Sequence, residues 1–503
     1  MARHNLTILL ISSVLSLVCY RQALMSRYGA TLSEALSIID REYIEPVDSR
    51  ILFEGAMDGM MNKLDPYSGY TPPDEYNQFQ ETMDGEFGGI GIVVEVNQET
   101  GRLTVLSPLV GTPAYKAGLR SGDTILAIDD HDTEGMSLPD SVKLMRGGVG
   151  SKVKVRIQHA SEPEPVEYEL ARANIPIESV LGDARRADGT WVYHLVDRPR
   201  IGYVRIINFG ERTGEELKTA LQSFREPGQQ IDGLIIDLRG NAGGLLNAAQ
   251  EVCDAFLDHG VIVTTRGRNG VERERREASL GTELPDDVPL VVLIDKYSAS
   301  ASEIVAACLQ DHERAMVVGQ RSWGKGTVQN VISLEGGRSA LRLTIGSYWR
   351  PSGHDIHKRE GAKDTDDWGV RPDPGQEVNF TNQEFETVVL ARRRRDVTSY
   401  EDLIAAKTSA PRAPAELPAP ESPPLPSPPT PSPDELAAPS LDVANPPVPV
   451  PDAESDDPAI RQAEQRAAAN ALKDPATIDA QLKQAIQRLE EEIRLRAGRP
   501  QSA

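Results

Sequence analysis

The sequence predicts a layered α/β domain that carries an inserted, smaller β-rich module. From about residue 201 onward, apolar stretches of strand length, such as Ile231–Leu238 and Val288–Ile294, alternate with stretches of helical spacing, which is typical of a layered α/β fold. Residues 85–172 contain short alternating strands and glycine-rich turns instead. Helical patterns precede both regions, and a proline-rich stretch separates them from a last helix.

The composition is that of an acidic chain that is long enough for more than one folded core. Its 503 residues include 54 Lys and Arg against 76 Asp and Glu, so the net charge is −22. This charge repels phosphate backbones and no dense basic stripe is present, so we expect no nucleic-acid partner. The three cysteines cannot form a disulfide framework and lack metal-ligand spacing, and we expect neither a metal nor an organic cofactor. The mean hydropathy of −0.38 excludes a polytopic membrane protein.

Residues 1–24 have the pattern of an export signal. Arg3 precedes the apolar run Leu6–Tyr20, and Arg21 follows it. The run is short for a membrane span of ~20 residues, and no small-x-small cleavage site follows it. We expect a signal-anchor, with a cleaved signal peptide or an internal core segment as the alternatives. Either export interpretation places the body outside the cytoplasm, on the periplasmic side, and the anchor would hold it to the inner membrane through residues 6–20.

Residues 28–84 form the predicted N-terminal helical region. Apolar residues recur at helical spacing from Leu32 through Ile39 and again from Ile51 to Leu64. The turn-rich stretch Asp65–Tyr70 follows. We expect this region to serve packing or contact between copies of the chain.

Residues 85–172 combine short strands with two short helices and a glycine loop. The loop, Gly88-Gly-Ile-Gly-Ile92, lacks the spacing and the strand–loop–helix unit of a nucleotide-binding G-x-G-x-x-G motif. Together with Ser121-Gly-Asp-Thr-Ile-Leu-Ala-Ile128 downstream, it resembles a PDZ domain. The resemblance implies that a substrate's C-terminus binds the loop and adds as a strand beside it. The residues of that binding site are Gly89, Ile90, Gly91 and Ile92.

Three familiar catalytic arrangements find no support in residues 173–400. His259 and His312 are the histidines nearest the glycine-rich loops, but neither sits in a base motif, and no Gly-x-Ser-x-Gly elbow exists. No carboxylate pair stands out among the 76 acids, and no His-x-x-x-His or Cys-x-x-Cys metal motif occurs. A serine paired with a lysine remains.

Three motifs of this region resemble those of C-terminal processing peptidases, also called tail-specific proteases, which are serine proteases with a PDZ domain. The resemblance spans roughly residues 30–395 and departs from the family at Ala242, where proline is common. It implies an α/β catalytic core of the ClpP/crotonase-like type. It also implies an endopeptidase that recognises and cleaves near the C-terminal tails of extracytoplasmic proteins. The motifs are Asp237-Leu-Arg-Gly-Asn-Ala-Gly-Gly244, Asp295-Lys-Tyr-Ser-Ala-Ser-Ala-Ser-Glu-Ile304 and Gly319-Gln-Arg-Ser-Trp-Gly-Lys-Gly-Thr-Val-Gln329.

The resemblance implies a role for single residues of these motifs. Ser300 matches the nucleophile, and Lys325, 25 residues later, matches the general base. Gln329 matches the side chain that orients this lysine in some members, whereas Asp311 matches a position implicated in others. The third catalytic residue therefore stays open between Gln329 and Asp311.

The chemistry that such a site needs agrees with these positions. Ser300 is expected at the start of a helix, where unpaired N–H groups and the helix dipole favour developing negative charge. The backbone N–H groups of Ala301, Gly243 and Gly244 are therefore the candidates for the oxyanion hole. A lysine acts as a base only when it is unprotonated, and burial lowers the pKa of a lysine from its reference value of ~10.4.

A catalytically idle or adaptor-activated PDZ tether is the alternative function. An idle tether is expected to lack the serine, the lysine or the glycine loops, and all three are present. Proteins or peptides with free C-termini are the expected partners, together with the membrane and with a second copy or an adaptor protein.

The last part of the chain is a proline-rich linker followed by a helix. Residues 410–458 hold 17 of the 36 prolines and nine acids against one arginine, which predicts a disordered spacer or a polyproline ligand. Residues 459–503 form the C-terminal helical segment, which in this family commonly follows the catalytic part closely. We expect it to dock back on the body or to pair with another copy. Its apolar stripe is Leu482, Ile486, Leu489 and Ile493.

Overall fold

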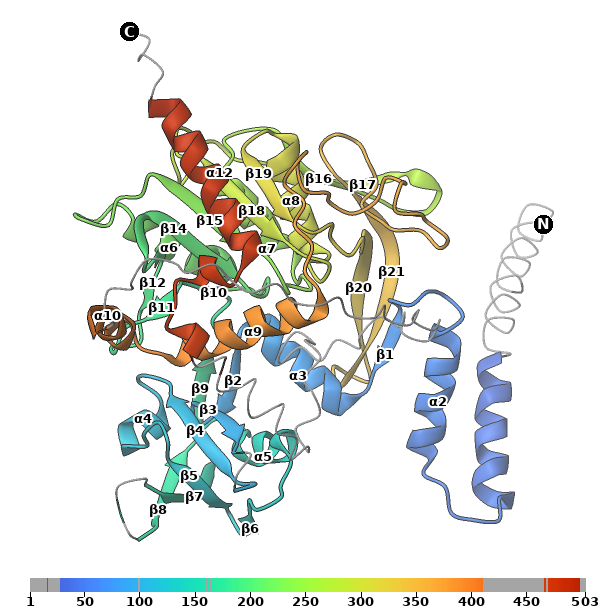
Figure 1. The fold of residues 1–503 in the computed structure, drawn as a ribbon. Helices are drawn as coiled ribbons and strands as arrows, with labels where there is room; N and C mark the ends of the chain where they lie inside the picture. The colour runs from blue at the N-terminus through green and yellow to red at the C-terminus, as the bar shows by residue number, and fades with distance from the viewer. Residues whose placement is uncertain are drawn as a thin grey trace, which may run out of the picture. The chain divides into compact units, whose positions relative to one another are not determined.

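The computed structural model describes residues 16, 28–97, 100–159, 162, 164–409, 466 and 469–497. The chain divides into two compact units, each described by itself. The first unit is Met1–Tyr76 with Gln329–Thr344, and the second is Asn77–Val328 with Ile345–Ala503. Figure 1 shows the elements along the chain. The predicted export signal and the proline-rich linker lie outside the described residues, apart from residue 16. Within the described ranges, no helix combines the length and the apolarity needed to cross a membrane.

The first unit contains helices and a small antiparallel sheet. Residues 28–42 are helical, and Asp48 caps α2 (Ser49–Met61) by accepting the N–H of Arg50. The stretch Asp65–Tyr70 is a turn that leads into β1 (Gly69–Thr71), which pairs antiparallel with β21 (Ser339–Trp349). The unit also contains most of β20 (Thr327–Leu334) and the start of α3 (Pro73–Asp84).

The β-rich module lies in the second unit. Its sheet has the order β3-β4-β5-β7-β8, with β6 beside β5, and its apolar core runs from Ile90 to Leu170. In β7, Val153, Val155 and Ile157 are buried while their neighbours point outward, because side chains alternate along a strand. The elements are β3 (Ile92–Val96), β4 (Leu103–Pro108), α4 (Pro113–Ala117), β5 (Thr124–Ile128), β6 (His131–Asp132), α5 (Leu138–Met145), β7 (Lys152–Gln158) and β8 (Val166–Ala171).

Short strand pairs lead from this module into the α/β layers. β2 pairs antiparallel with β9 where the chain enters and leaves the module, and β11 pairs with β12 shortly afterwards. β16, β17 and the end of β21 form a second sheet within this unit. The elements are β2 (Glu86–Gly89), β9 (Ala173–Pro176), β11 (Ala184–Arg185), β12 (Trp191–Val192), β16 (Val261–Arg266), η1 (Arg268–Gly270) and β17 (Glu272–Glu277).

The central sheet of the second unit has the order β10-β14-β15-β18-β19, with β13 beside β14. β14, β15, β18 and β19 are parallel, and β15 and β18 are buried along their whole length, as is typical of a sheet covered on both faces. The carboxyl ends of these strands therefore meet at one edge. The strands are β10 (Val180–Leu181), β13 (His194–Leu195), β14 (Arg198–Ile206), β15 (Gly233–Asp237), β18 (Leu290–Ile294) and β19 (Ala315–Gly319).

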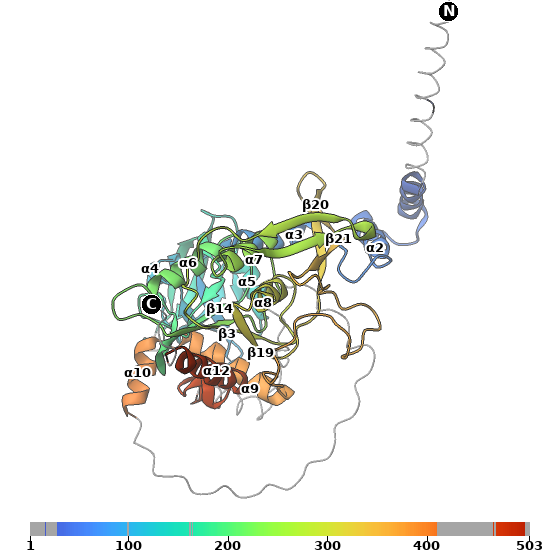
Figure 2. The same cartoon turned by 90° about the horizontal axis from the view of Figure 1, so that it is seen from above.

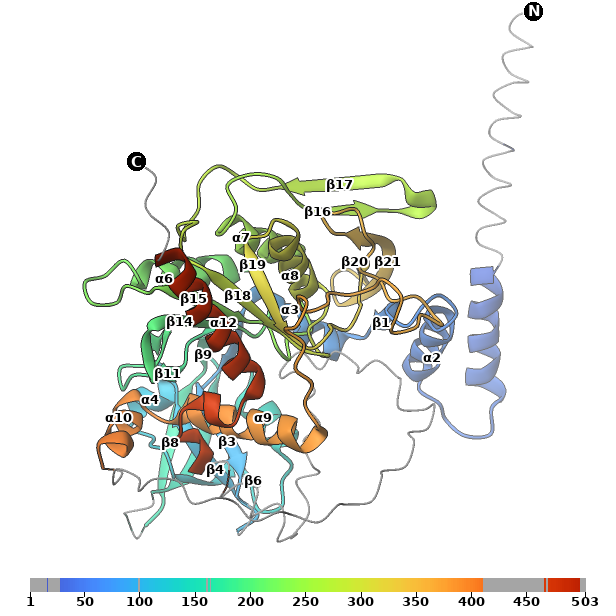
Figure 3. The ribbon, with the colours of Figure 1, turned by 45° about the horizontal axis from the view of Figure 1, so that its top comes forward.

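Helices cover both faces of this sheet (Figures 2 and 3). α6 (Thr213–Ser223), α7 (Leu246–Asp254) and α8 (Ala301–Asp311) share one apolar core with it. On the other face lies α12 (Ala480–Ala497), preceded by η3 (Pro475–Thr477). The predicted stripe of the terminal helix is in this interface: Leu482, Ile486 and Leu489 are buried against the sheet, and Ile493 packs beside them. α9 (Asn382–Val397) and α10 (Tyr400–Ser409) complete the described fold.

Candidate active site

The three sequence motifs follow three neighbouring parallel strands of the central sheet. Residues 238–245 follow β15, residues 295–300 follow β18 and residues 320–326 follow β19. Because the carboxyl ends of parallel strands lie at the same edge, these loops converge. This edge is therefore the candidate active site.

Ser300 is the N-cap of α8 and has an unusual backbone conformation. Its φ is 55° and its ψ is −112°, a region that residues other than glycine seldom adopt and that is often found at functional sites. The residue is 9% exposed, so it lies just beneath the surface. The N-terminal end of the helix dipole beside it favours negative charge.

The two serines that flank Ser300 join this segment to the loop after β15. The Ser298 hydroxyl donates to the carbonyl oxygen of Leu238 at 2.9 Å. The Ser302 hydroxyl donates to the carbonyl oxygen of Asn241, also at 2.9 Å. Both side chains are fully buried, so their hydroxyls have packing roles.

The glycine-rich loop after β15 is fixed by the buried side chain of Asn241. Its amide nitrogen donates to the carbonyl oxygen of Ile206, and its amide oxygen accepts the N–H of Gly243, both at 2.8 Å. Gly243 has a φ of 108°, and a Cβ at this position would lie 2.7 Å from the Cβ of Ser300. Only glycine therefore allows the loop to approach Ser300 this closely.

The three backbone N–H groups expected to form the oxyanion hole differ in whether they already donate a hydrogen bond. The N–H of Gly243 already donates to Asn241, so it does not point into an open oxyanion site. Gly244 lies opposite Phe209 in an isolated parallel β-bridge. The hydrogen bonds of this bridge join Phe209 to the Gly243 carbonyl and to the Leu245 N–H, so the N–H of Gly244 is not used in it. Ala301 is the first residue of α8, where N–H groups have no partner within the helix.

Glu303 connects the Ser300 segment with the loop of Lys325, and the sequence motifs did not single it out. Its buried carboxylate accepts the N–H groups of Ser300 at 2.8 Å, Gly324 at 2.6 Å and Lys325 at 2.8 Å, and the Ser322 hydroxyl at 2.5 Å. Burial raises the pKa of Glu303 to about 7, although these hydrogen bonds oppose the increase. A Glu three residues after an N-cap serine fits the capping-box pattern, which is the signal that could have identified it.

Lys325 lies in a loop whose backbone is held on both sides. The N–H of Lys358 donates to the carbonyl oxygen of Gly324 at 2.8 Å, and the N–H of Tyr348 donates to that of Gly326 at 2.7 Å. A Cβ at Gly326 would lie 2.2 Å from the backbone nitrogen of residue 357. The structure thus brings the half-buried Lys325 to the first turn of α8, where its N–H meets Glu303.

The structure shows side-chain contacts for both candidates for the third catalytic residue. Asp311 ends α8, about 16 Å along the helix axis from Ser300. There it accepts from the Arg350 guanidinium and, at 2.9 Å, from the N–H of Ser352. Gln329 belongs to the first unit, where its amide donates to the Thr344 hydroxyl at 3.3 Å. Asp311 is therefore at the opposite end of the helix from the lysine loop.

The histidines considered from the sequence have other contacts. His312 is the C-cap of α8 and bonds through Nε2 to the carbonyl oxygen of Val261 at 2.8 Å. His259 is exposed and contacts Asp258. Across the described part of the chain, no group of three His, Cys, Asp or Glu residues is arranged to hold a metal ion.

The glycine loop of the β-rich module is also closely packed. Gly91 has a φ of 78°, and a Cβ there would lie 2.3 Å from the Cβ of Thr112. The Thr112 hydroxyl donates to the Gly91 carbonyl, and the Ala114 N–H donates to the Ile90 carbonyl, both at 3.0 Å. β3, which follows the loop from Ile92, lies at one end of the strand order of its sheet. An edge strand of this kind is able to accept a further strand.

Comparison with known proteins assigns the chain to a family. Residues 200–373 match peptidase family S41, residues 104–159 match the PDZ domain, and residues 22–74 match the N-terminal domain of the activating protease CtpB. The chain is 39% identical over 339 residues to a carboxy-terminal-processing protease of Bartonella bacilliformis, covering 67% of this chain and 73% of that protein. It is 36% identical over 326 residues to a carboxyl-terminal-processing protease of Synechocystis sp., covering 64% and 72%.

Other similar proteins carry related names. The carboxy-terminal processing protease CtpB of Bacillus subtilis is 36% identical over 330 residues, which is 65% of each chain. Among solved structures, a photosystem II D1 C-terminal processing protease is 28% identical, with a TM-score of 0.38, and the match covers 69% of this chain and 92% of that one. The identities to the curated relatives, together with the matched domains, show that this chain belongs to the carboxy-terminal processing proteases of peptidase family S41, serine proteases with a PDZ domain.

Proposed function

We propose that Ser300 and Lys325 form the catalytic dyad of this protease, and that it cleaves near the C-terminal tails of extracytoplasmic proteins. The observation that carries the proposal is the buried carboxylate of Glu303, which accepts the N–H groups of both Ser300 and Lys325. A serine at a helix start and a lysine from another loop are thereby held at one place, which is the arrangement that nucleophilic catalysis needs.

In the proposed reaction, the Ser300 hydroxyl attacks the scissile carbonyl carbon while unprotonated Lys325 takes its proton. Lys325 then gives this proton to the leaving amine, and water hydrolyses the acyl-enzyme, again with Lys325 as the base. The half-burial of Lys325 supports this role, because burial disfavours the charged form of an amine. By its match to the family motif, Gln329 is the proposed residue that orients the lysine.

The negative charge of the tetrahedral intermediate is assigned to two backbone donors. The N–H groups of Ala301 and Gly244 are proposed to stabilise the oxyanion, helped by the dipole of α8. Gly243 is assigned a steric role instead, since its N–H is engaged by Asn241 and its Cα lies against Ser300.

The PDZ domain, which we place at residues 85–172, is proposed to hold the substrate's C-terminal carboxylate. Gly89, Ile90, Gly91 and Ile92 would bind it, and the tail would add as a strand beside β3. The packed glycine loop and the edge position of β3 support this assignment. We further propose that residues 173–400 form a ClpP/crotonase-like core, that residues 410–458 form a linker, and that residues 6–20 anchor the enzyme on the periplasmic side of the inner membrane.

The proposal is tested with a folded reporter that carries an apolar C-terminal tail, as the free acid and as the amide. The full-length enzyme is expected to cleave the free-acid reporter and to cleave the amidated one at least about tenfold more slowly, because the carboxylate contact is lost. Ser300→Ala is expected to abolish cleavage while still binding the tail. Cleavage by Ser300→Ala at the wild-type rate would contradict the dyad. Binding without cleavage by the wild type would instead indicate an idle or adaptor-activated PDZ tether.

A further inference from the structure

The C-terminal segment, residues 469–497, is joined to the peptidase core by ion pairs of two arginines, of which Arg198 contacts both Asp474 and Glu490. Arg198 of β14 pairs with Asp474 at 2.8 Å. Arg239, which follows β15, pairs with Asp479 at 2.9 Å. Asp474 precedes the short helix η3 and Asp479 precedes the long helix α12, but the two arginines lie in different surroundings.

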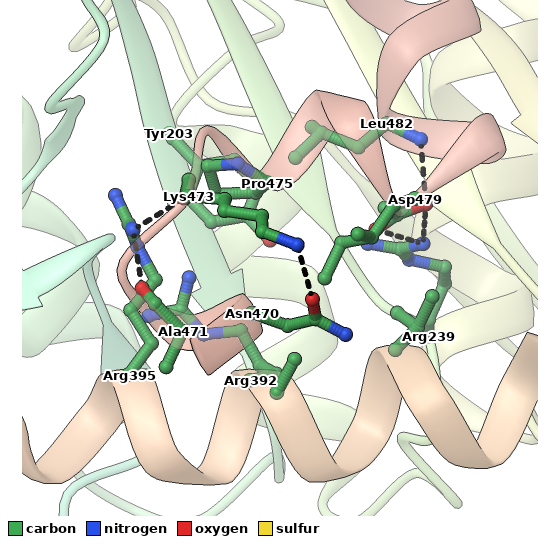
Figure 4. A pocket seen from close by; sticks show the side chains of 13 residues that line it. Tyr203, Arg239, Arg392, Arg395, Asn470, Ala471, Lys473, Pro475, Asp479 and Leu482 are labelled. Carbon is green, nitrogen blue, oxygen red and sulfur yellow. Dashed lines mark hydrogen bonds and ion pairs between the residues drawn. The ribbon is translucent and has the colours of Figure 1, made fainter. Parts of the chain in front are cut away.

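Arg239 is held between two carboxylates, one from the core and one from the C-terminal segment. Its Nε and Nη2 donate to the two oxygens of Asp237 at 2.9 and 2.6 Å. Its Nη1 donates to Asp479 at 2.9 Å and to the amide oxygen of Gln481 at 3.3 Å. Figure 4 shows Arg239 and Asp479 facing each other beside the pocket that the segment covers. The C-terminal segment thus supplies part of the hydrogen-bond acceptors of the Arg239 guanidinium.

Asp479 ties this contact to the position of α12. Its Oδ1 also accepts the N–H of Leu482 at 2.9 Å, so the carboxylate caps the helix start. Leu482 is buried against the central sheet. The packing of α12 therefore fixes the carboxylate that holds Arg239.

Arg239 lies at the start of the loop that ends beside Ser300. Two residues further on, the carbonyl oxygen of Asn241 accepts the N–H of Ala299 at 3.0 Å. Gly243 then lies against Ser300 so closely that a Cβ would clash. A shift of Arg239 would consequently move Asn241 and Gly243 relative to Ser300.

We propose that Asp479 is a positioning residue for catalysis, which holds Arg239 and thereby fixes residues 239–244 against Ser300. The proposal rests on the roles of Ser300 and Gly244 in the proposed function. It makes the C-terminal segment part of the active-site structure, although residues 410–468 separate it in sequence from the catalytic part. A displacement of about 1 Å at reacting groups is enough to reduce the rate about a hundredfold.

Asp474 provides a matched control within the same segment. Like Asp479 it caps a helix start, because its Oδ1 accepts the N–H of Ala476 at 3.0 Å, and it pairs with an arginine of the sheet. Its partner Arg198 lies at the start of β14, away from the loop after β15. Asn is a good N-cap residue, so Asp→Asn at both positions keeps the caps, removes the negative charge and replaces one acceptor oxygen by an NH₂ donor.

The experiment compares full-length wild type, Asp479→Asn, Asp474→Asn and Ser300→Ala by kcat, KM and melting temperature on the tailed reporter. We expect Asp479→Asn to lower kcat at least about tenfold with KM unchanged, and Asp474→Asn to keep kcat within about twofold at a similar loss of melting temperature. Equal kcat values for the two Asn variants would overturn the inference. Activity retained by Ser300→Ala would instead overturn the proposed function.

A second variant serves if Asp479→Asn does not fold. Gln481→Ala removes the weaker contact to Arg239, made at 3.3 Å, together with the hydrogen bond that the buried Gln481 amide donates to the carbonyl oxygen of Val378 at 2.8 Å. The inference expects it to lower kcat about two- to threefold with KM unchanged. A wild-type kcat in a folded Gln481→Ala enzyme would contradict it.

Discussion

Glu303 shows how much of this site depends on one buried side chain. Four donors from two loops meet its carboxylate, including the N–H groups of Ser300 and Lys325. Protonation would replace one acceptor position by a donor, so the ionised form suits this environment, whereas burial favours the neutral form. The pKa of about 7 reflects this opposition.

Replacement of Glu303 by Gln is expected to lower kcat about a hundredfold, because the amide presents an NH₂ group to backbone donors and separates the two loops.

The same replacement should also remove the part of the pH dependence of the unfolding free energy that comes from the Glu303 carboxyl. The folded pKa is raised to about 7, so this group stabilises the fold fully below its unfolded pKa, and that contribution is lost as the pH rises toward 7. Denaturant unfolding between pH 4.5 and 7.5 measures this, and identical slopes in wild type and Glu303→Gln would contradict the assignment.

The close approach of Gly243 to Ser300 gives a second prediction at this scale. Gly243→Ala places a Cβ 2.7 Å from the Cβ of Ser300, so we expect kcat to fall about a hundredfold. Gly228→Ala is the matched control, because Gly228 also has a positive φ but has open space where its Cβ would lie. It should lose about 1 kcal/mol of unfolding free energy and keep its activity. Steady-state kinetics and thermal melts of both variants decide this.

At the scale of elements, the glycine loop before β3 is expected to control tail recognition. Gly91→Ala forces a Cβ to 2.3 Å from Thr112 and displaces the loop. We expect KM for the free-acid reporter to rise about tenfold and the preference over the amidated reporter to disappear. In Gly122→Ala the new Cβ meets open space at a similar φ, and KM should not change. A preference for the free acid that survives Gly91→Ala would show that another element binds the tail.

The elements also show what the sequence could and could not predict. The buried strands β15 and β18, and the motifs that follow them, were predictable because continuous apolar runs and local spacing mark them. The hydrogen bond from the Gly243 N–H to the Asn241 side chain was not predictable, since it depends on the folded conformation of the loop. The short strand Gly69–Thr71 reads as a turn in the sequence, and its partner β21 lies some 270 residues away, where no local pattern indicates it.

At the scale of the whole molecule, the C-terminal segment is part of the folded core. The sequence showed its apolar stripe but not its partner, and it gave no sign that Asp479 reaches the loop of Arg239. Such contacts depend on how α12 lies on the sheet, which helical periodicity does not determine. The capping-box pattern of Glu303 with Ser300 is visible in the sequence, but the donors from residues 322–325 meet its carboxylate only in three dimensions.

Deletion of residues 459–503 is therefore expected to destabilise the enzyme. Leu482, Ile486 and Leu489 are buried in this interface, and each contributes about 1.5–3 kcal/mol by burial. We expect the melting temperature to fall by at least about 10 °C. A chain shortened only within residues 410–458 keeps α12 and should melt like the wild type. Equal melting temperatures for all three chains would contradict the packing role of α12.

The central claim, that Ser300 is the nucleophile, is tested most directly on the three serines of its run. Cleavage of the free-acid reporter is measured for Ser298→Ala, Ser300→Ala and Ser302→Ala in parallel. The structure predicts that Ser300→Ala alone abolishes cleavage, because the other two hydroxyls bond to backbone carbonyls of the neighbouring loop and their loss lowers the rate less than about tenfold. Wild-type cleavage by Ser300→Ala, or complete loss in one of the other two folded variants, would contradict the claim.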